Sequence, residues 1–329
     1  MTLPATPPPP PSLGASWCEL RELGVLAVQG ADAAEFLHGQ LSSDIKALRP
    51  GHAQYSSYNS PKGRMLATLV VLRTADDAFR ILLAADLAES VRKRLAMFVL
   101  RSKVSVANAG GEVFRAGVGG PGAAAAVTGA LGSAPPAFSA VERDGVVALA
   151  LPDGRFVVLA PLDRAPTLRS ALAAHAGTAD ESSWQWLAIH AGVPTVTAAT
   201  TDQFVAQTAN WDLLGGVNFQ KGCYPGQEIV ARTQYLGRLK ERLYAFHVDG
   251  PPPPAGTRLY AEPFGDQPCG TVVNAAPSPG GGSDLLAVVQ ITAIDGGNVR
   301  LGERDGPALE PQPLPYAIPA PAAPRGRIS

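Results

Sequence analysis

The sequence predicts an α+β protein with two ferredoxin-like α+β lobes followed by a small C-terminal β-barrel. In the N-terminal half, apolar runs of strand length alternate with helical patterns, and this order occurs twice. Beyond about residue 241, short apolar runs separated by Pro and Gly remain without a helical pattern, which is typical of a barrel. The 329 residues suffice for two or three domains.

Shifts in composition along the chain indicate where the domains begin and end. The expected divisions are a Pro-rich tail at 1–15, a first lobe at 16–110, a second lobe at 111–180, a return segment at 181–240, a barrel at 241–306 and a Pro-rich tail at 307–329. Both tails are expected to lie outside the fold, the first as an extended, disordered segment.

The first lobe begins with an apolar strand at 24–28. Asp32 and Glu35 stand in front of Phe36 with the spacing of a capping box, which predicts a helix start. The other elements of this lobe are predicted as strands at 65–71, 78–83 and 103–106 and a helix at 86–98. The second lobe is predicted as strands at 114–118, 146–151 and 156–159 and helices at 122–131 and 165–175. Barrel strands are expected at 243–248, 271–273, 285–291 and 299–301.

Charge and cysteine content exclude some classes of protein. The chain has 27 Lys and Arg residues and 28 Asp and Glu residues. The resulting net charge of −1 argues against a strongly basic nucleic-acid protein. Three cysteines spread along the chain do not make a disulfide framework and fit a reducing compartment. No apolar run approaches the roughly 20 residues of a membrane span, and the N-terminus lacks a signal peptide, so a cytoplasmic location is expected.

The segment Lys221-Gly-Cys-Tyr-Pro-Gly-Gln-Glu228 has the strongest chemical pattern in the chain. A turn precedes a helix predicted at 227–233, with Ile229 and Val230 facing inward. Cys223 then stands before a helix N-terminus and two residues from Lys221, and both features favour a thiolate.

The same segment also allows a purely structural reading. Gly222 and Gly226 permit close approach of the backbone to a ligand, but a Gly/Pro loop with a buried cysteine is the plainer alternative. Glu228 and Arg232 are four residues apart and could pair on one helix face. No Cys and His residues have metal-ligand spacing, so no stably bound metal is predicted.

This octapeptide resembles the signature K-G-C-Y-x-G-Q-E of the YgfZ family of folate-binding proteins. The resemblance extends over about residues 18–316 and includes the segments 30–41, 62–64, 101–104, 184–194, 214–219 and 313–316. One departure is Ala206, where relatives commonly have Pro, and this change affects loop rigidity only.

The resemblance implies the fold of the glycine-cleavage aminomethyltransferase (T-protein), in which two α+β lobes and a β-barrel surround a central folate-binding hole. It also implies a function: support of iron–sulfur cluster assembly or repair in client enzymes, including a radical enzyme that methylthiolates tRNA. The implied ligand is tetrahydrofolate, and the implied partner is an iron–sulfur carrier or client enzyme. Direct nucleic-acid or membrane binding is not expected.

The resemblance further implies two groups of site residues. The folate group consists of Trp184, Gln40, Asp44, Tyr58, Lys62 and Arg64, of which Lys62 and Arg64 suit the anionic tail of folate. The signature group consists of Lys221, Gly222, Cys223, Tyr224, Gly226, Gln227, Glu228 and Arg232. Cys223 is the expected reactive group, either as a transient iron ligand or in a mixed disulfide with a partner. Gln227 and Glu228 either pair with the pterin edge or hold the loop.

Three other functions remain as alternatives. An aminomethyltransferase needs a carboxylate after the Gly63 turn, but Ala67 and Thr68 stand there, so this enzyme activity is not expected. A Cys-dependent hydrolase or transferase would need His38 or His190 within reach of the thiol. A non-folate interaction scaffold would use the Pro-rich tails.

Overall fold

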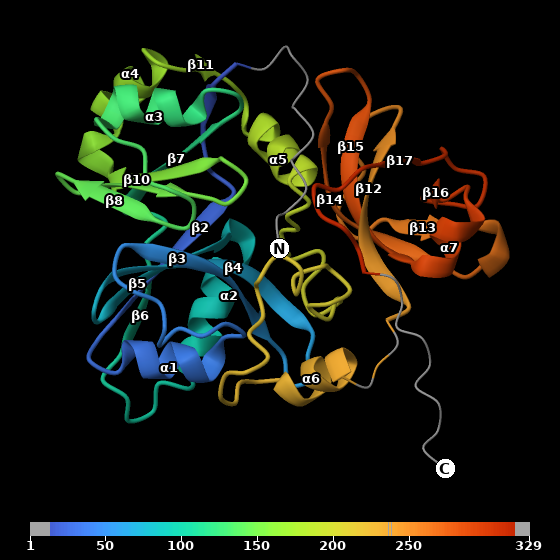
Figure 1. The fold of residues 1–329 in the computed structure, drawn as a ribbon, viewed down its shortest axis with the longest axis horizontal. Helices are drawn as coiled ribbons and strands as arrows, with labels where there is room; N and C mark the ends of the chain where they lie inside the picture. The colour runs from blue at the N-terminus through green and yellow to red at the C-terminus, as the bar shows by residue number, and fades with distance from the viewer. Residues whose placement is uncertain (1–13, 236, 238, 320–329) are drawn as a thin grey trace.

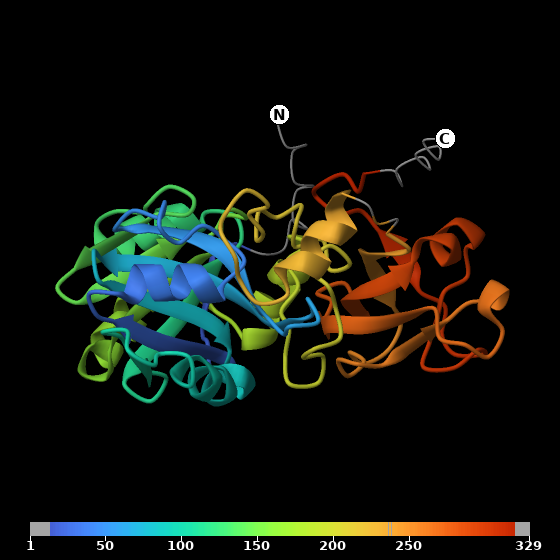
Figure 2. The same cartoon turned by 90° about the horizontal axis from the view of Figure 1, so that it is seen from below.

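The computed structural model describes residues 14–235, 237 and 239–319, which form three β-sheets with helices packed around them (Figure 1). Two sheets form the two lobes on one side of the molecule, and the third sheet, curled into a half-barrel, lies on the other side (Figure 2). The predicted α+β fold is therefore confirmed. The predicted N-terminal tail at 1–15 lies almost entirely outside the described residues, whereas of the predicted C-terminal tail at 307–329 only residues 320–329 lie outside them.

The first lobe contains a five-stranded sheet of order β3-β4-β5-β2-β6. Its elements are β2 (Leu23–Gln29), α1 (Ala33–Gln40), β3 (His52–Asn59), β4 (Met65–Ala75), β5 (Ala78–Ala84), α2 (Ala85–Ala96) and β6 (Ser105–Asn108). Helix α1 begins where the capping box predicted, but the side-chain contact of a capping box does not form at Asp32. Asp32 occupies the N-cap of α1 without a side-chain cap, because its carboxylate accepts the backbone N–H of Lys103 instead.

Strand β3 was not predicted, because its sequence is polar and lacks an apolar alternation. Its serines are nevertheless buried, and their hydroxyl groups find partners inside the protein. Ser57 donates to the hydroxyl of Ser42 at 2.9 Å, and Ser42 donates to the carbonyl of Gly216 at 2.6 Å. Tertiary hydrogen bonds therefore make a polar strand suitable for the core.

The second lobe contains a six-stranded sheet of order β11-β1-β7-β10-β9-β8. Its elements are β1 (Ser16–Glu19), β7 (Val113–Gly119), α3 (Ala123–Leu131), β8 (Ala140–Arg143), β9 (Val146–Ala150), β10 (Phe156–Pro161), the short 3₁₀ helix η1 (Leu162–Arg164), α4 (Ala165–Ala173) and β11 (Gly177–Thr178). Strand β1 pairs antiparallel with β7, with Trp17 opposite Val118, so residues 16–19 belong to the second lobe and not to the first as predicted.

The third sheet has the order β16-β13-β14-β15-β12-β17. Its elements are β12 (Glu241–Val248), β13 (Arg258–Tyr260), the 3₁₀ helix η2 (Glu262–Phe264), β14 (Gly270–Pro277), β15 (Ser283–Gln290), α7 (Ile291–Gly296), β16 (Arg300–Leu301) and β17 (Glu310–Gln312). Two expectations are corrected here. Helix α7 interrupts the strands, and β17 pairs with β12, so the fold continues past residue 306.

The return segment carries α5 (Glu181–His190) and α6 (Gln227–Tyr235), and α5 lies between the lobes and the third sheet (Figure 1). One carboxylate on β15 joins α5 to that sheet. Asp284 accepts hydrogen bonds from the indole N–H of Trp186 at 2.6 Å, from His190 at 2.9 Å and from Nδ1 of His247 on β12 at 2.6 Å. Burial opposes ionisation of Asp284, but these hydrogen bonds outweigh it and lower its pKa.

Replacement of Asp284 by Asn is expected to lower the free energy of unfolding at pH 7 by about 2–3 kcal/mol, because the charged acceptor of three hydrogen bonds is lost. The folded-state pKa of Asp284 is lowered. The ionised carboxylate therefore stabilises the folded state fully above the unfolded carboxyl pKa of about 3.9, and this stabilisation is lost progressively as the pH falls from there toward the lowered folded-state pKa. Urea unfolding of both proteins between pH 7 and 3 should therefore show a difference that shrinks in acid. A difference that is constant with pH would contradict this role.

Candidate functional site

A central cavity of about 680 Å³ is enclosed by both lobes, α5, the third sheet and the loop at residues 252–255. Its volume is typical of a site for a drug-sized or cofactor-sized ligand. Apolar groups line most of it, and the polar and charged lining residues are Arg21, Glu22, Tyr55, Thr68, Asp86, Arg155, Glu181, Trp184, Gln185, Thr195, Thr197, Trp211 and Asn274.

Trp184, on the first turn of α5, forms part of the cavity wall. Its expected role in folate binding stays a prediction. Gly117 on β7 makes room for its ring, since a Cβ at Gly117 would lie 2.5 Å from Trp184 Cε3. The guanidinium of Arg155 lies over the ring, 4.4 Å from its centroid. The indole is therefore held between a strand and a cation.

Tyr55, on β3, and Trp211 are the cavity-lining side chains with a buried polar atom that lacks a hydrogen-bond partner among the described residues. The side chain of Tyr55 is 3% exposed, and its hydroxyl is the unpartnered atom. Burial, followed by the charge of Asp153, raises its pKa. A buried hydroxyl without a partner is costly, so this group is suited to bind a polar atom of a ligand in the cavity.

Acidic groups stand at the α5 side of the cavity. The carboxylate of Glu181 accepts the backbone N–H groups of Arg21 and Glu22, both at 2.9 Å. Burial is the main cause of a raised pKa of Glu181. Glu22 accepts a hydrogen bond from Gln185, and Asp86 at the start of α2 accepts the backbone N–H of Ala198 at 2.9 Å.

Thr68, one of the two residues expected to stand where an aminomethyltransferase would carry an acid, lies in the cavity wall. Its hydroxyl accepts the backbone N–H of Val196 at 3.0 Å. The neighbouring Ala67 is fully buried. Neither side chain can exchange a proton at neutral pH.

The other five residues of the predicted folate group do not line this cavity. Gln40 ends α1, and Tyr58 is buried in the first lobe, where burial raises its pKa. Lys62 and Arg64 lie exposed at the turn between β3 and β4, with Arg64 donating to the carbonyl of Gln203 at 2.5 Å. All five positions were expected to face the central hole. They lie elsewhere in the structure, because a local motif does not show on which side of a sheet a loop folds.

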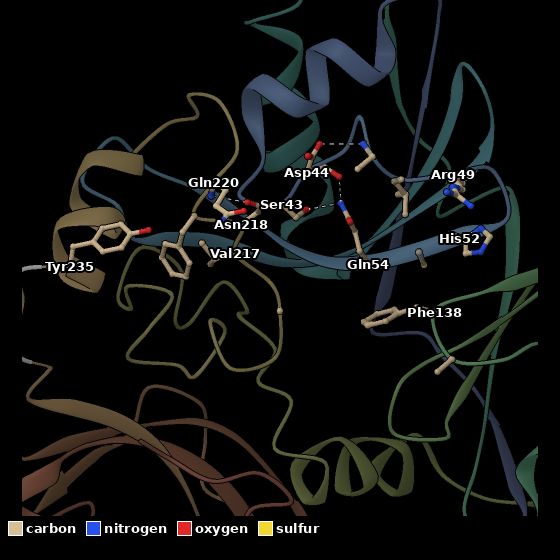
Figure 3. A pocket seen from close by; sticks show the side chains of 16 residues that line it. Ser43, Asp44, Arg49, His52, Gln54, Phe138, Val217, Asn218, Gln220 and Tyr235 are labelled. Carbon is tan, nitrogen blue, oxygen red and sulfur yellow. Dashed lines mark hydrogen bonds between the residues drawn. The ribbon is translucent and has the colours of Figure 1, made fainter. Parts of the chain in front are cut away.

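Asp44 lies in a separate groove of about 710 Å³ between residues 43–54 and 215–220 (Figure 3). The amide of Gln54 donates to the hydroxyl of Ser43 at 2.9 Å and to the backbone carbonyl of Asp44 at 3.1 Å. Tyr235 of α6 lies at one end of the groove (Figure 3). Gln220, which also lines the groove, directly precedes the signature segment.

The signature loop at residues 221–226 is anchored by Lys221. Its buried ammonium group donates to the backbone carbonyls of His38 and Leu41, the latter at 2.6 Å, at the C-terminal end of α1. Burial lowers the pKa of Lys221 to about 8. These hydrogen bonds tie the loop to α1. The expectation that the ammonium also favours a thiolate at Cys223 stays a prediction, and the two groups interact through their charges.

The other signature residues divide between buried and exposed positions. Tyr224 is buried, which raises its pKa to about 12, and the amide of Gln227 donates to the carbonyl of Lys221 at 3.3 Å. Gly226 has φ +78°, and a Cβ there would lie 2.5 Å from the carbonyl oxygen of Ser60, so this position requires Gly. The loop therefore packs on the β3–β4 turn.

Helix α6 differs in two respects from the prediction. Ile229 is 38% exposed, because it packs beside Gly63 at the surface, whereas Val230 is buried as expected. Glu228 and Arg232 are both exposed and make no ion pair with each other within the described part of the chain.

Cys223 is exposed at the tip of this loop, whereas Cys18 and Cys269 are buried. Gly222 beside it faces His38, whose Nε2 atom would lie 3.6 Å from a Cβ at Gly222. Nδ1 of His38 lies 3.1 Å from Asp44, and burial, followed by the charge of Lys221, lowers the pKa of this imidazole. The other candidate base, His190, is engaged with Asp284 and does not belong to this loop.

Within residues 14–235, 237 and 239–319, no three His, Cys, Asp or Glu side chains are grouped so that they could hold a metal ion. The helices in the same part of the chain are all too short or too polar to span a membrane.

Three comparisons with known proteins agree with this architecture. The family described as the GCVT N-terminal domain matches residues 13–140. The tRNA-modifying protein YgfZ of Sodalis glossinidius (strain morsitans) is 30% identical over 320 residues, which cover 96% of this chain and 97% of that protein. This chain belongs to the YgfZ family. The YgfZ protein of Enterobacter sp. (strain 638) is 31% identical over 91% of the chain and 92% of its own length.

The fold of this YgfZ family member is that of a glycine-cleavage T-protein. The aminomethyltransferase T of the glycine cleavage system from Bartonella henselae matches with a TM-score of 0.75 over 93% of this chain and 87% of its own, at 19% identity. The family and the fold predicted from the sequence are both confirmed.

A thiol-specific reagent should distinguish the three cysteines. Ellman's reagent is expected to modify one thiol of the native protein rapidly, because burial raises the pKa of Cys18 to about 12 and of Cys269 to about 11 while Cys223 is exposed. Cys223→Ser should abolish the fast phase, and denaturation should expose all three thiols of the wild type. Two fast thiols in the native protein would contradict the assignment.

Proposed function

We propose that this protein binds a reduced folate in its central cavity and supports the assembly or repair of iron–sulfur clusters in client enzymes, including radical enzymes that modify tRNA. Membership of the YgfZ family, whose relatives carry the name tRNA-modifying protein, supports the connection to tRNA modification. The near-neutral charge of the chain favours an indirect connection, because proteins that bind RNA phosphates usually carry an excess of Lys and Arg.

The observation that carries the folate proposal is the cavity itself, which combines the indole of Trp184 with the unpartnered hydroxyl of Tyr55. A pterin has a flat apolar face and a polar edge. The half-buried indole offers an apolar wall, and the hydroxyl of Tyr55 and the carboxylates of Glu22 and Glu181 offer hydrogen-bond partners for that edge. Arg21, exposed at the rim, suits the anionic glutamate tail.

Cys223 and the folate cavity occupy different surfaces of the protein, since no residue of the signature octapeptide lines the cavity. We therefore assign the thiol to contact with a partner protein rather than with folate. A single exposed thiolate can hold iron transiently or form a mixed disulfide, but it cannot complete a cluster alone. A carrier or client enzyme would have to supply the remaining ligands.

The alternative of an aminomethyltransferase lacks a proton acceptor at the expected place. Thr68 occupies that part of the cavity wall, and its hydroxyl is already engaged with the backbone of Val196. We therefore favour a binding protein that uses folate without this transfer step.

Titration calorimetry with tetrahydrofolate tests the ligand assignment. Wild-type protein should bind saturably, and Trp184→Phe should weaken binding about five- to tenfold, because a smaller ring loses apolar contact area. Trp17→Phe is the matched control, since Trp17 belongs to the core of the second lobe and does not line the cavity. Absence of binding at millimolar tetrahydrofolate would refute the proposal.

A complementation experiment tests the thiol. In cells that lack their own relative, Cys223→Ser should fold and bind tetrahydrofolate as the wild type does but fail to restore methylthiolated tRNA, measured by mass spectrometry. Cys269→Ala is the control, because that thiol is buried in the third sheet. Full restoration by Cys223→Ser would remove the thiol from the function.

A further inference from the structure

The loop between α2 and β6 exposes three large apolar side chains within four residues. Met97 is 65% exposed, Phe98 44% and Leu100 87%, whereas Val99 between them is half-buried and packs against the core of the first lobe. Single exposed apolar side chains are common on protein surfaces, but a group of them marks a place of contact with another molecule. Met97, Phe98 and Leu100 together form what we call the apolar patch.

Leu100 has a backbone conformation that leucine disfavours. Its φ is +45°, in the left-handed region where a residue with a Cβ is strained. Asn or Gly would adopt this conformation at a lower free-energy cost and would not place an apolar side chain in water. Backbone hydrogen bonds hold the loop in place, and one of them joins the N–H of Ser102 to the carbonyl of Val99 at 2.8 Å. Stability therefore does not account for a leucine at this position, which points to a contact outside the chain.

Basic side chains surround the apolar patch. Residues 90–106 include no Asp or Glu, although the whole chain has one more acidic than basic residue, and their five basic residues are Arg92, Lys93, Arg94, Arg101 and Lys103. Arg101 and Lys103 are exposed and form no ion pair within the described part of the chain, whereas Arg92 and Lys93 share the carboxylate of Glu89. An apolar centre with a positive rim is complementary to an acidic surface.

The patch lies at one end of α1, and the signature loop lies at the other. The carboxylate of Asp32, at the N-cap of α1, accepts the backbone N–H of Lys103 at 2.7 Å. Lys221 of the signature loop donates to the carbonyls of His38 and Leu41 at the C-terminal end of the same helix.

The length of α1 sets the separation of these two loops. A helix of eight residues is about 12 Å long. An interface that covers about 800 Å² on each partner is roughly 30 Å across, so one protein can cover both ends of α1. In Figure 2, α1 (blue) and the signature helix α6 (gold) both face the viewer. A protein docked on the patch therefore also reaches the signature loop.

We propose that Met97, Phe98 and Leu100, with Arg101 and Lys103 at their rim, form a docking surface for the acidic face of the partner protein whose iron–sulfur ligands meet Cys223. The inference rests on the proposed function for the identity of that partner. RNA would pair with the cations but leave the apolar side chains in water, and a membrane would bring no ligands to the thiol. A protein with an acidic rim and an apolar centre matches both parts of the surface, since Met, Phe and Arg are enriched at protein interfaces.

Photo-crosslinking in cells identifies what covers the patch. With Met97→p-benzoylphenylalanine in the full chain, ultraviolet light is expected to join the protein to an iron–sulfur carrier or client enzyme, through a peptide that contains Asp or Glu and is identified by mass spectrometry. Leu162→p-benzoylphenylalanine is the control, because Leu162 is 53% exposed on η1 of the second lobe. An adduct with lipid, with RNA or with a protein that holds no iron–sulfur cluster, or no adduct, would overturn the inference.

A double substitution separates docking from stability. Leu100→Asn with Arg101→Glu should lower the restoration of methylthiolated tRNA at least about fivefold, because it removes the apolar centre and reverses a rim charge. Its thermal unfolding temperature should be equal to or above that of the wild type, since Asn tolerates the left-handed conformation. Tetrahydrofolate binding and the fast reaction of Cys223 with Ellman's reagent should be unchanged. Leu162→Asn with Arg164→Glu is the matched control and should restore the modification fully.

The outcomes separate this inference from the proposed function. Full restoration by Leu100→Asn with Arg101→Glu, or a loss that follows a lower unfolding temperature, would overturn the docking surface. Failure of the wild type to restore methylthiolated tRNA would refute the proposed function, whereas the cross-link at position 97 would still decide what docks on the patch.

Discussion

The carboxylate of Asp284 is the contact on which the arrangement of this molecule depends. It accepts hydrogen bonds from Trp186 and His190 of α5 and from His247 of the third sheet. The helix is thereby fixed to the half-barrel, while its first turn carries Trp184 into the cavity between the lobes. A cavity bounded by three separate sheets keeps its shape only if the element between them is held rigidly, and a charged acceptor with several donors provides that rigidity.

Buried polar groups in this protein fall into two kinds. The serine hydroxyls of β3 and the ammonium of Lys221 are satisfied by carbonyl groups or by one another, and these contacts fasten loops to the first lobe. The hydroxyl of Tyr55 has no such partner in the described structure, and the guanidinium of Arg155 is paired with Asp153 and lies over the indole of Trp184. The first kind explains the fold, whereas the second kind marks the surface that a ligand would meet.

The separation of the signature loop from the cavity bears on how a protein of this family could work. Cys223 is exposed on a loop that packs on α1 and on the turn between β3 and β4, and a polar groove runs alongside it. The cavity opens between the lobes and the half-barrel. A partner could therefore reach the thiol while a ligand occupies the cavity, and communication between them would have to pass through the shared core of the first lobe and return segment.

The sequence by itself determined the α+β class, most of the helices and the family, because these depend on local periodicity and on a contiguous motif. It left open whether Cys223 is buried, and the structure shows this thiol exposed. It assigned Trp184, Lys62 and Arg64 alike to a folate group, whereas in the structure Trp184 lines the cavity and Lys62 and Arg64 do not. Only the tertiary structure decided that β1 joins the second lobe and that Tyr55 and Arg155 meet at one cavity. Strand pairing and side-chain burial join residues far apart in the chain, and no local spacing records which face of a sheet closes over which partner.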